Sequence, residues 1–264
     1  MQTLWLRHDF SKAAEKLAGK FPDSSHAEQF RVEDTTWVSP DGETVAVLLC
    51  GAIPPELHLR ALELLKDVND FPSNRVTAMG TRSLARSIGR DGTPSPRSGV
   101  NVRVLRASPA RQALLGWDRP GHETPQTVRH REMLNGNRAL IELADRIYKR
   151  HLPIAYAKQR VEIEAKAPHY RLWKTTFTGL YVAKKFRTAY HRDGNLKGAM
   201  TAITPLGSFV GGALVLLRWR VAIPYKCGDL LLFNSEELHG NLPFKGERLS
   251  AAFFCGAWVA HCGE

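Results

Sequence analysis

The C-terminal part of the chain consists of short apolar runs separated by glycine, proline and asparagine, and this pattern limits the folds open to it. The runs cover residues 176–184, 199–203, 212–219, 229–233 and 249–258. Apolar runs this short, bounded by turn-forming residues, are typical of β-strands rather than helices. Several such strands in succession predict a β-sandwich or barrel of the jelly-roll type.

The N-terminal half has mixed patterns. Residues 1–34 are polar and partly helical, and residues 35–50 predict a hairpin around the turn Ser39-Pro-Asp-Gly. Pro54-Pro55 can open an amphipathic helix that continues to Val68, and a second helix is expected over residues 137–150. The fold class expected from the whole chain is α+β, with N-terminal helices flanking the β-rich core.

Composition restricts the setting in which the protein works. The 264 residues carry a formal net charge of +11, which favours a polyanionic partner such as nucleic acid. No apolar run reaches the roughly 18 residues that span a bilayer, and the N-terminus has no signal-peptide pattern. The four cysteines form no CxxC pair and are expected to be free thiols. We therefore expect an intracellular protein without a membrane partner.

Residues 72–111 form an arginine-rich, glycine- and serine-rich stretch with few large apolar residues. It is either a solvated loop or a loop that contacts nucleic-acid phosphates, through arginines that include Arg82, Arg86, Arg90 and Arg97.

Basic residues elsewhere leave the same two possibilities open. Lys184 and Arg187 precede the motif described next and can be solubilising charges or phosphate contacts. Arg218 and Arg220 flank Trp219 as a stacking and phosphate patch or a solvated strand face. Asn195 is a candidate for a hydrogen bond to a base edge.

A His-x-Asp motif at the end of an expected strand is the first sign of a metal centre. Alternate strand residues point to the same face, so His191 and Asp193 can bind one metal ion. His239 follows the strand Gly228-Asp-Leu-Leu-Leu-Phe, which can return it to the same place. Two histidines and a carboxylate on one face are the ligand set of non-haem iron(II) oxygenases, which leaves positions for a co-substrate and dioxygen.

Arg248 follows these three candidate ligands in the sequence, at the start of the last apolar strand. A guanidinium binds a carboxylate through two parallel hydrogen bonds, as the distal carboxylate of 2-oxoglutarate requires. Ser250, two positions on, offers a hydroxyl on the same face.

The segment 173–258 resembles the TET/JBP family of DNA-base oxygenases. The resemblance is strongest in FRTAYHRDGNLKG, FVGGALVLLRWRVAIPYKCGDLLLFNSEELHGNLPF and GERLSAAFF. It implies a double-stranded β-helix (jelly-roll, cupin-like), with His191, Asp193 and His239 as iron ligands and Arg248 as the 2-oxoglutarate anchor. It also implies a dioxygenase that uses Fe(II), 2-oxoglutarate and O2 to oxidise 5-methylcytosine in DNA to 5-hydroxymethylcytosine, and onward to formyl and carboxyl forms.

The expected organisation is one catalytic domain over residues 1–264. It comprises a helical and hairpin support region (1–70), the arginine-rich stretch (72–111) and the double-stranded β-helix core (170–260). We expect a monomer, in the nucleus of a eukaryote or in the cytoplasm of a bacterium or phage-infected cell. Three alternatives stay open: the same chemistry on thymine or RNA, the same chemistry on a protein or amino acid, and a basic nucleic-acid-binding module without catalysis.

Overall fold

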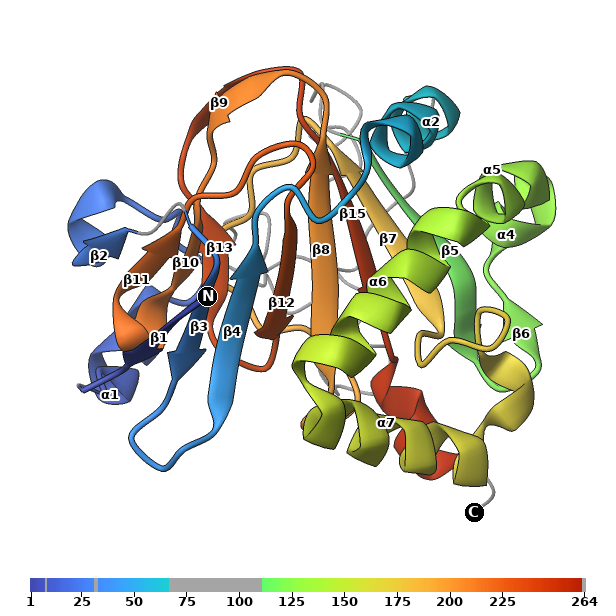
Figure 1. The fold of residues 1–264 in the computed structure, drawn as a ribbon, viewed down its shortest axis with the longest axis horizontal. Coiled ribbons are helices and arrows are strands. Elements are labelled where there is room, and N and C mark those ends of the chain that lie inside the picture. The colour runs from blue at the N-terminus through green and yellow to red at the C-terminus, as the bar shows by residue number, and fades with distance from the viewer. Residues whose placement is uncertain (8, 31–32, 67–110, 263–264) are drawn as a thin grey trace, which may run out of the picture.

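The fold is organised around one large sheet (Figure 1), seen in a computed structural model that describes residues 1–7, 9–30, 33–66 and 111–262. Its strands are β1 (Gln2–Trp5), β3 (Thr35–Val38), β4 (Thr44–Leu49), β5 (Arg111–Arg119), β6 (His122–Glu123), β7 (Gly179–Lys184), β8 (Met200–Leu206), β12 (Leu230–Asn234) and β15 (Leu249–Phe254). Their order in the sheet is β1-β3-β4-β12-β8-β15-β7-β5-β6.

A smaller sheet faces the large one on the side away from the long helices (Figure 1). It contains β2 (Gln29–Phe30), β10 (Leu214–Leu216), β11 (Val221–Ile223) and β13 (His239–Asn241), in the order β13-β10-β11-β2. A further pair joins β9 (Phe209–Gly211) to β14 (Phe244–Gly246).

Helices cover the opposite face of the large sheet. The helices on this side are α2 (Pro55–Leu65), α4 (Pro125–Arg129), α5 (Arg131–Gly136), α6 (Arg138–His151) and α7 (Pro153–Lys166). The short helix α1 (Ser11–Ala14) packs instead beside the smaller sheet. Short 3-10 turns are η1 (Glu15–Leu17), η2 (Ser24–His26), η4 (Pro168–Tyr170), η5 (Leu217–Trp219) and η6 (Ala257–His261). None of the described helices is long and apolar enough to cross a membrane.

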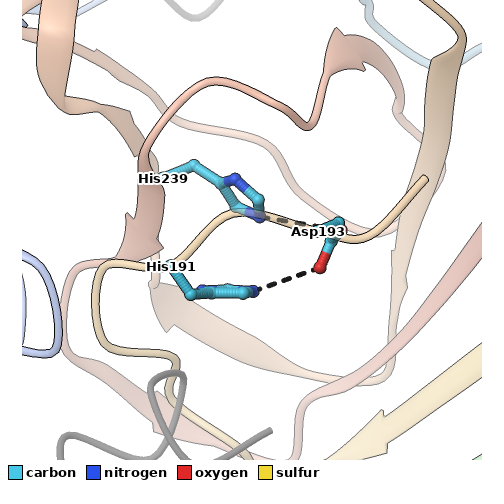
Figure 2. A group of neighbouring side chains, drawn as sticks. All are labelled: His191, Asp193 and His239. Carbon is cyan, nitrogen blue, oxygen red and sulfur yellow. Dashed lines mark ion pairs between the residues drawn. The ribbon is translucent and has the colours of Figure 1, made fainter. Parts of the chain in front are cut away.

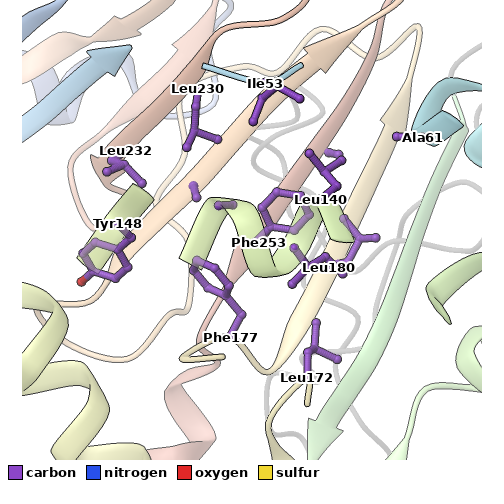
Figure 3. Packing of buried hydrophobic residues seen from close by; sticks show 14 of the residues in the cluster. Ile53, Ala61, Leu140, Tyr148, Leu172, Phe177, Leu180, Leu230, Leu232 and Phe253 are labelled. Carbon is purple, nitrogen blue, oxygen red and sulfur yellow. The ribbon is translucent and has the colours of Figure 1, made fainter. Parts of the chain in front are cut away.

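Strand β12 shows how the sequence builds the two layers. Leu230 and Leu232 belong to the cluster that packs against α2 and α6 (Figure 3), whereas Leu231 and Phe233 belong to the cluster shared with the smaller sheet. Because successive side chains of a strand point to opposite faces, an unbroken apolar run indicates a strand buried on both sides. This arrangement confirms the predicted double-stranded β-helix core.

Some boundaries differ from those expected. The run 212–219 is not one strand, because η5 follows β10. After η5 ends at Trp219, Arg220 has a φ of 51° and reverses the chain into β11. The run 249–258 stops as a strand at Phe254 and continues as η6 after Gly256. The expected hairpin over residues 35–50 is present as β3 and β4, and α2 and α6 correspond to the two expected helices. Strand β1 and helix α7 were not expected.

Candidate metal and co-substrate site

His191, Asp193 and His239 meet between the two sheets (Figure 2). Their candidate ligand atoms all lie within 4.8 Å of one another. Asp193 Oδ1 is 3.5 Å from His191 Nε2, and Asp193 Oδ2 is 3.9 Å from His239 Nε2. Ligand atoms about 2 Å from a shared ion lie about 3 Å apart when their bonds are at right angles. Both carboxylate–imidazole distances are thus within about an ångström of the value in a metal-bound arrangement.

The hydrogen bonds of the two imidazoles fix which nitrogen faces the site. Nδ1 of His191 lies 2.8 Å from the carbonyl of Ala189, and Nδ1 of His239 lies 2.8 Å from the carbonyl of Glu237. Since a carbonyl oxygen only accepts, each Nδ1 carries the hydrogen and each Nε2 keeps a lone pair. In the neutral imidazoles, both Nε2 atoms can then bind a metal. Metal-binding histidines commonly donate their other ring N–H to a backbone carbonyl in this way.

The backbone holds the three residues in place. The N–H of His191 donates to the carbonyl of His239 at 2.9 Å, and the N–H of His239 returns a bond to the carbonyl of His191 at 3.0 Å. Asp193 donates its N–H to the carbonyl of Ser235 at 3.0 Å. The site is therefore positioned by main-chain pairing between the His-x-Asp segment and the segment around β13.

Arg248 is a buried cation with a free donor atom. Its side chain is 3% exposed, and its Nη1 donates to the carbonyl of Gly212 at 3.2 Å. Nη2 donates to the hydroxyl of Tyr225, and the rings of Phe209, Tyr225 and Phe244 lie 5.1–5.4 Å from Cζ. Within the described chain these partners include no carboxylate, and Nε has no hydrogen-bond partner. A buried guanidinium with an unused donor fits an arriving carboxylate such as that of 2-oxoglutarate.

Ser250 faces the same interior space. Leu249, Ala251 and Phe253 of β15 pack into the helix-side cluster, so Ser250 points to the other face, toward the smaller sheet. His239 lies on that side too, because its ring contacts Phe233 at 5.0 Å. The metal ligand and the two candidate anchor residues therefore share one compartment.

Asn241 and Tyr225 also lie in this compartment, although neither was among the expected site residues. The Nδ2 of Asn241 donates to the carbonyl of Gly212 at 3.2 Å and to the Tyr225 hydroxyl at 3.4 Å. Asn241 is two residues after His239 on β13, so one strand connects the metal ligand to the Arg248 surroundings. The alternation along β13 was the available signal, since it places positions 239 and 241 on one face.

The side-chain amide of Asn195 makes hydrogen bonds inside the protein. Its Nδ2 donates to Oγ1 of Thr201 at 2.9 Å and to Oγ of Ser235 at 2.8 Å. Thr201 and Ser235 are themselves 2% and 0% exposed, and their hydroxyls are 2.9 Å apart. Both amide hydrogens are engaged in this cluster, which argues against the expected contact with a base edge.

Some of the candidate phosphate contacts lie within the described residues, and others do not. Arg82, Arg86, Arg90 and Arg97 lie outside the described residues. Arg187 donates to the carbonyls of Asn241 and Pro22, and burial lowers the pKa of its guanidinium. Lys184 donates to the carbonyl of Lys66 from β7, which is paired on both sides and is not an edge strand. Arg187 and Lys184 thus have internal partners.

A family model for the oxygenase domain of the 2OGFeDO superfamily, Tet_JBP, matches residues 119–257. This match covers more than half of the chain and includes the three candidate metal ligands and both candidate anchor residues, Arg248 and Ser250. The chain belongs to the Tet_JBP family. It is therefore an oxygenase domain of the type that uses Fe(II), 2-oxoglutarate and O2, and the His191, Asp193 and His239 cluster fits the iron.

Curated proteins similar to this Tet_JBP chain include two with named activities. The bifunctional helicase and thymine dioxygenase JBP2 of Trypanosoma brucei brucei is 30% identical over 220 residues, which are 79% of this chain and 18% of that protein. The thymine dioxygenase JBP1 of Crithidia fasciculata is 27% identical over 227 residues, 85% of this chain and 25% of that protein. The chain thus spans about a quarter or less of these relatives.

A solved structure with the same fold is that of NgTET1 in complex with 5mC DNA. The TM-score is 0.57 at 13% sequence identity, over 89% of this chain and 82% of that chain. At this identity the likeness establishes the shared double-stranded β-helix fold.

Proposed function

We propose that this Tet_JBP domain oxidises the 5-methyl group of a pyrimidine base in DNA, with 5-methylcytosine as the first candidate base. The observation that carries the proposal is the complete His191, Asp193 and His239 cluster beside the buried Arg248, within a chain that matches this family. The formal net charge of +11 supports a polyanionic substrate.

Each residue of the site has a separate task in this proposal. His191, Asp193 and His239 hold iron(II), which together with 2-oxoglutarate and dioxygen supplies the oxidising chemistry. Arg248 and Ser250 bind and orient the distal carboxylate of 2-oxoglutarate. Because these residues are buried, a base in a duplex must be flipped out to approach them, at a cost of a few kcal/mol.

Thymine is the second candidate base. It is favoured by the relatives JBP2 and JBP1, whose names describe thymine dioxygenases. Both bases carry the same 5-methyl group in the major groove, so the same iron site can serve either. The choice between them depends on contacts to the rest of the base.

The test is incubation of the iron-loaded protein with 2-oxoglutarate and DNA oligonucleotides that differ at one base: 5-methylcytosine, thymine or cytosine. Nucleoside mass spectrometry measures 5-hydroxymethylcytosine, its formyl and carboxyl forms, and 5-hydroxymethyluracil. Asp193→Ala is the inactive control. Hydroxymethylcytosine supports the first candidate, and hydroxymethyluracil alone supports the second.

Succinate without any modified base, on single- and double-stranded DNA, would overturn the DNA substrate and leave the oxygenase chemistry in place. RNA and peptide substrates would then be compared by the same succinate measurement. The monomeric state, the single-domain organisation and the intracellular location remain predictions. Size-exclusion chromatography with light scattering and imaging of the tagged protein test the first and the last.

A further inference from the structure

The N-terminal segment, residues 9–30, is bonded to the part of the chain that carries His191 and Asp193. Gly19 donates its N–H to the carbonyl of Tyr190 at 2.8 Å, and Tyr190 donates to the carbonyl of Lys20 at 2.9 Å. Tyr190 directly precedes His191 and is fully buried. This segment lies outside the family match, which begins at residue 119, yet it bonds to the residue next to a candidate metal ligand.

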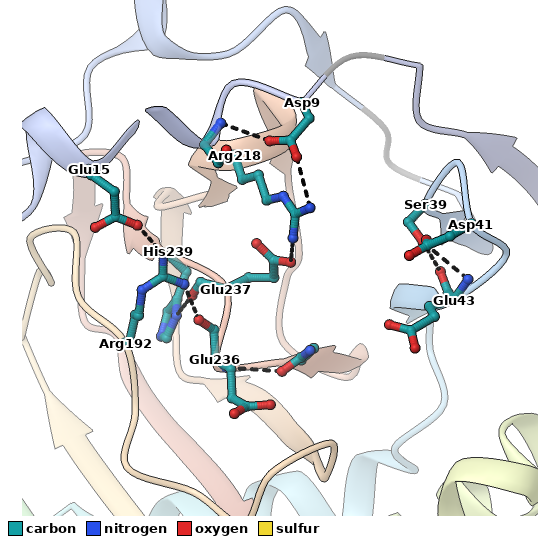
Figure 4. Close-up of polar contacts among 12 residues, drawn as sticks. Asp9, Glu15, Ser39, Asp41, Glu43, Arg192, Arg218, Glu236, Glu237 and His239 are labelled. Atoms are coloured by element: carbon teal, nitrogen blue, oxygen red, sulfur yellow. Dashed lines mark hydrogen bonds and ion pairs between the residues drawn. The ribbon is translucent and has the colours of Figure 1, made fainter. Parts of the chain in front are cut away.

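Arg218 connects this segment to the second histidine (Figure 4). Its Nη2 is 2.8 Å from Oδ2 of Asp9, and its Nη1 is 3.1 Å from Oε1 of Glu237. The main chain adds a bond, because Phe10 donates its N–H to the carbonyl of Arg218 at 2.9 Å. The Arg218 guanidinium also lies over the Trp219 ring, 4.4 Å from its centroid, which fixes its direction.

Glu237 links Arg218 to His239, because it contacts both residues. Its carboxylate pairs with Arg218, while its backbone carbonyl accepts the Nδ1 hydrogen of His239 at 2.8 Å. The Glu237 side chain is only 10% exposed. A carboxylate this buried is costly without a charged partner, so loss of Arg218 would favour its movement to solvent. The carbonyl that orients His239 belongs to the same residue and would move with it.

Arg192 holds the same turn from the other side. It lies between the ligands His191 and Asp193, and its guanidinium donates to the carbonyl of Glu236 and pairs with the carboxylate of Glu15. The turn at residues 235–238 is thus clamped by two arginines, each of which also holds a carboxylate of the N-terminal segment (Figure 4).

We propose that Arg218 is a positioning residue of the metal centre: its ion pairs with Asp9 and Glu237 fix the turn whose carbonyl orients the His239 imidazole. This inference rests on the metal site of the proposed function. It assigns to a residue in η5, remote in sequence from the ligands, a role that outer-layer partners of metal ligands commonly have.

The structure offers a matched control in Arg220. Both arginines flank Trp219, and both join the N-terminal segment. Arg220 pairs instead with Glu28 at 2.8 Å and donates to the carbonyl of Ser25 at 3.1 Å. Loss of Arg220 removes a tether of the same kind, while the Arg218–Glu237 pair stays in place.

The experiment measures Mn(II) binding to the metal-free full chain by electron paramagnetic resonance, in the parent, Arg218→Met, Arg220→Met, Glu237→Ala and the double variant Arg218→Met/Glu237→Ala. Circular dichroism first confirms equal folding, and thermal unfolding midpoints are recorded for each. We expect Arg218→Met to weaken Mn(II) binding about tenfold or more, whereas Arg220→Met lowers the unfolding midpoint alone. The double variant should lose no more Mn(II) affinity than the weaker-binding of the two single variants, because both substitutions break the same Arg218–Glu237 ion pair.

Equal Mn(II) affinity in Arg218→Met and Arg220→Met, or additive losses in the double variant, would overturn the positioning role. If Arg218→Met does not fold, Glu237→Ala carries the test, since it removes the tether between Arg218 and the turn. Mn(II) binding weaker than in the parent would support the positioning role, and Mn(II) binding as tight as in the parent would overturn it. If the parent binds Mn(II) and His191→Ala abolishes this binding, the metal binds at the proposed site. A parent that binds no Mn(II) through His191 overturns the proposed site, and this inference with it.

Discussion

Gly212 lies directly against Arg248. A Cβ placed on Gly212 would come within 2.6 Å of Arg248 Nη1 and 3.3 Å of its Cζ, and the φ of Gly212 is +77°. Only glycine combines this backbone conformation with so close an approach. The guanidinium therefore owes its position beside the Gly212 carbonyl to the missing side chain.

Gly212→Ala should displace the Arg248 guanidinium and weaken 2-oxoglutarate binding about tenfold, with Mn(II) affinity unchanged. Calorimetric titration of the Mn(II)-loaded protein with 2-oxoglutarate measures this. Gly42→Ala is the control, because Gly42 also has a positive φ, of +88°, but has nothing within 4 Å of an added Cβ. Equal 2-oxoglutarate affinity in the parent and Gly212→Ala would contradict the assignment of Arg248.

Arg248→Lys should weaken 2-oxoglutarate binding although the charge is kept. A lysine cannot reproduce the planar fork that binds a carboxylate through two hydrogen bonds. Loss of a charge-assisted bond of about 1.5–3 kcal/mol corresponds to roughly 10–100-fold in affinity. The same titration checks it, and a Lys variant that binds as well as the parent would show that the co-substrate carboxylate lies elsewhere.

Asp193→Ala should abolish metal binding more completely than any outer-layer change, which costs roughly 10–100-fold. Asp145→Asn is a suitable control, because Asp145 is buried and accepts hydrogen bonds from Tyr156 and Thr176 at 2.8–2.9 Å. The control should lower thermal stability and leave Mn(II) affinity as it was. Retained Mn(II) binding in Asp193→Ala would rule out the proposed ligand set.

Asn195→Ala should cost about 1–3 kcal/mol of folding stability, because it leaves the buried hydroxyls of Thr201 and Ser235 with fewer partners. Denaturant unfolding measures this loss. The ratio of products from 5-methylcytosine and thymine oligonucleotides should not change. A variant of normal stability with an altered product ratio would instead restore Asn195 as a base-reading residue.

Asp9 should make a small, pH-dependent contribution to stability. Its hydrogen bond from Arg218 lowers the pKa of the carboxyl from 3.8 to about 2 in the folded state. The stabilisation is therefore present above about pH 4 and is lost as the pH falls toward 2. Since the side chain is 42% exposed, Asp9→Asn should cost at most about 1 kcal/mol at neutral pH and nothing below pH 2. Urea unfolding at pH 7, 4 and 2 tests this, and a constant difference across the series would contradict it.

The metal ligands could be predicted from the sequence because their chemistry and their local geometry coincide. His191 and Asp193 are two residues apart in a segment that was expected to end a strand. In the structure this segment forms an isolated bridge between His191 and His239, the first residue of β13. Arg248 was predictable for the same reason, as the residue just before an apolar strand. The period of two along a strand places Arg248, whereas the His-x-Asp pair is placed by the His191–His239 bridge and by the bond from Asp193 to Ser235.

The supporting residues could not be predicted in this way. Asp9 and Arg218 are far apart in the sequence. From its neighbours alone, Arg218 was expected in a basic patch or on a solvated strand face, whereas in the structure it pairs with Asp9 and Glu237. Asn195 resembled an accessible amide because nothing local indicates that Thr201 and Ser235 close around it. Such contacts depend on tertiary packing, which a single sequence pattern does not record.

The order of strands in the large sheet has a consequence for how the protein is made. Ala46 of β4 pairs with Phe233 of β12, and β3 reaches the sheet through β4. The apolar hairpin of β3 and β4 is therefore synthesised long before the strand that completes its pairing. Pairing between such distant segments is slow, and the waiting strand edge is prone to aggregation. Folding of this domain should thus finish only after the last strands have emerged from the ribosome, with β4 as the segment most in need of chaperone protection.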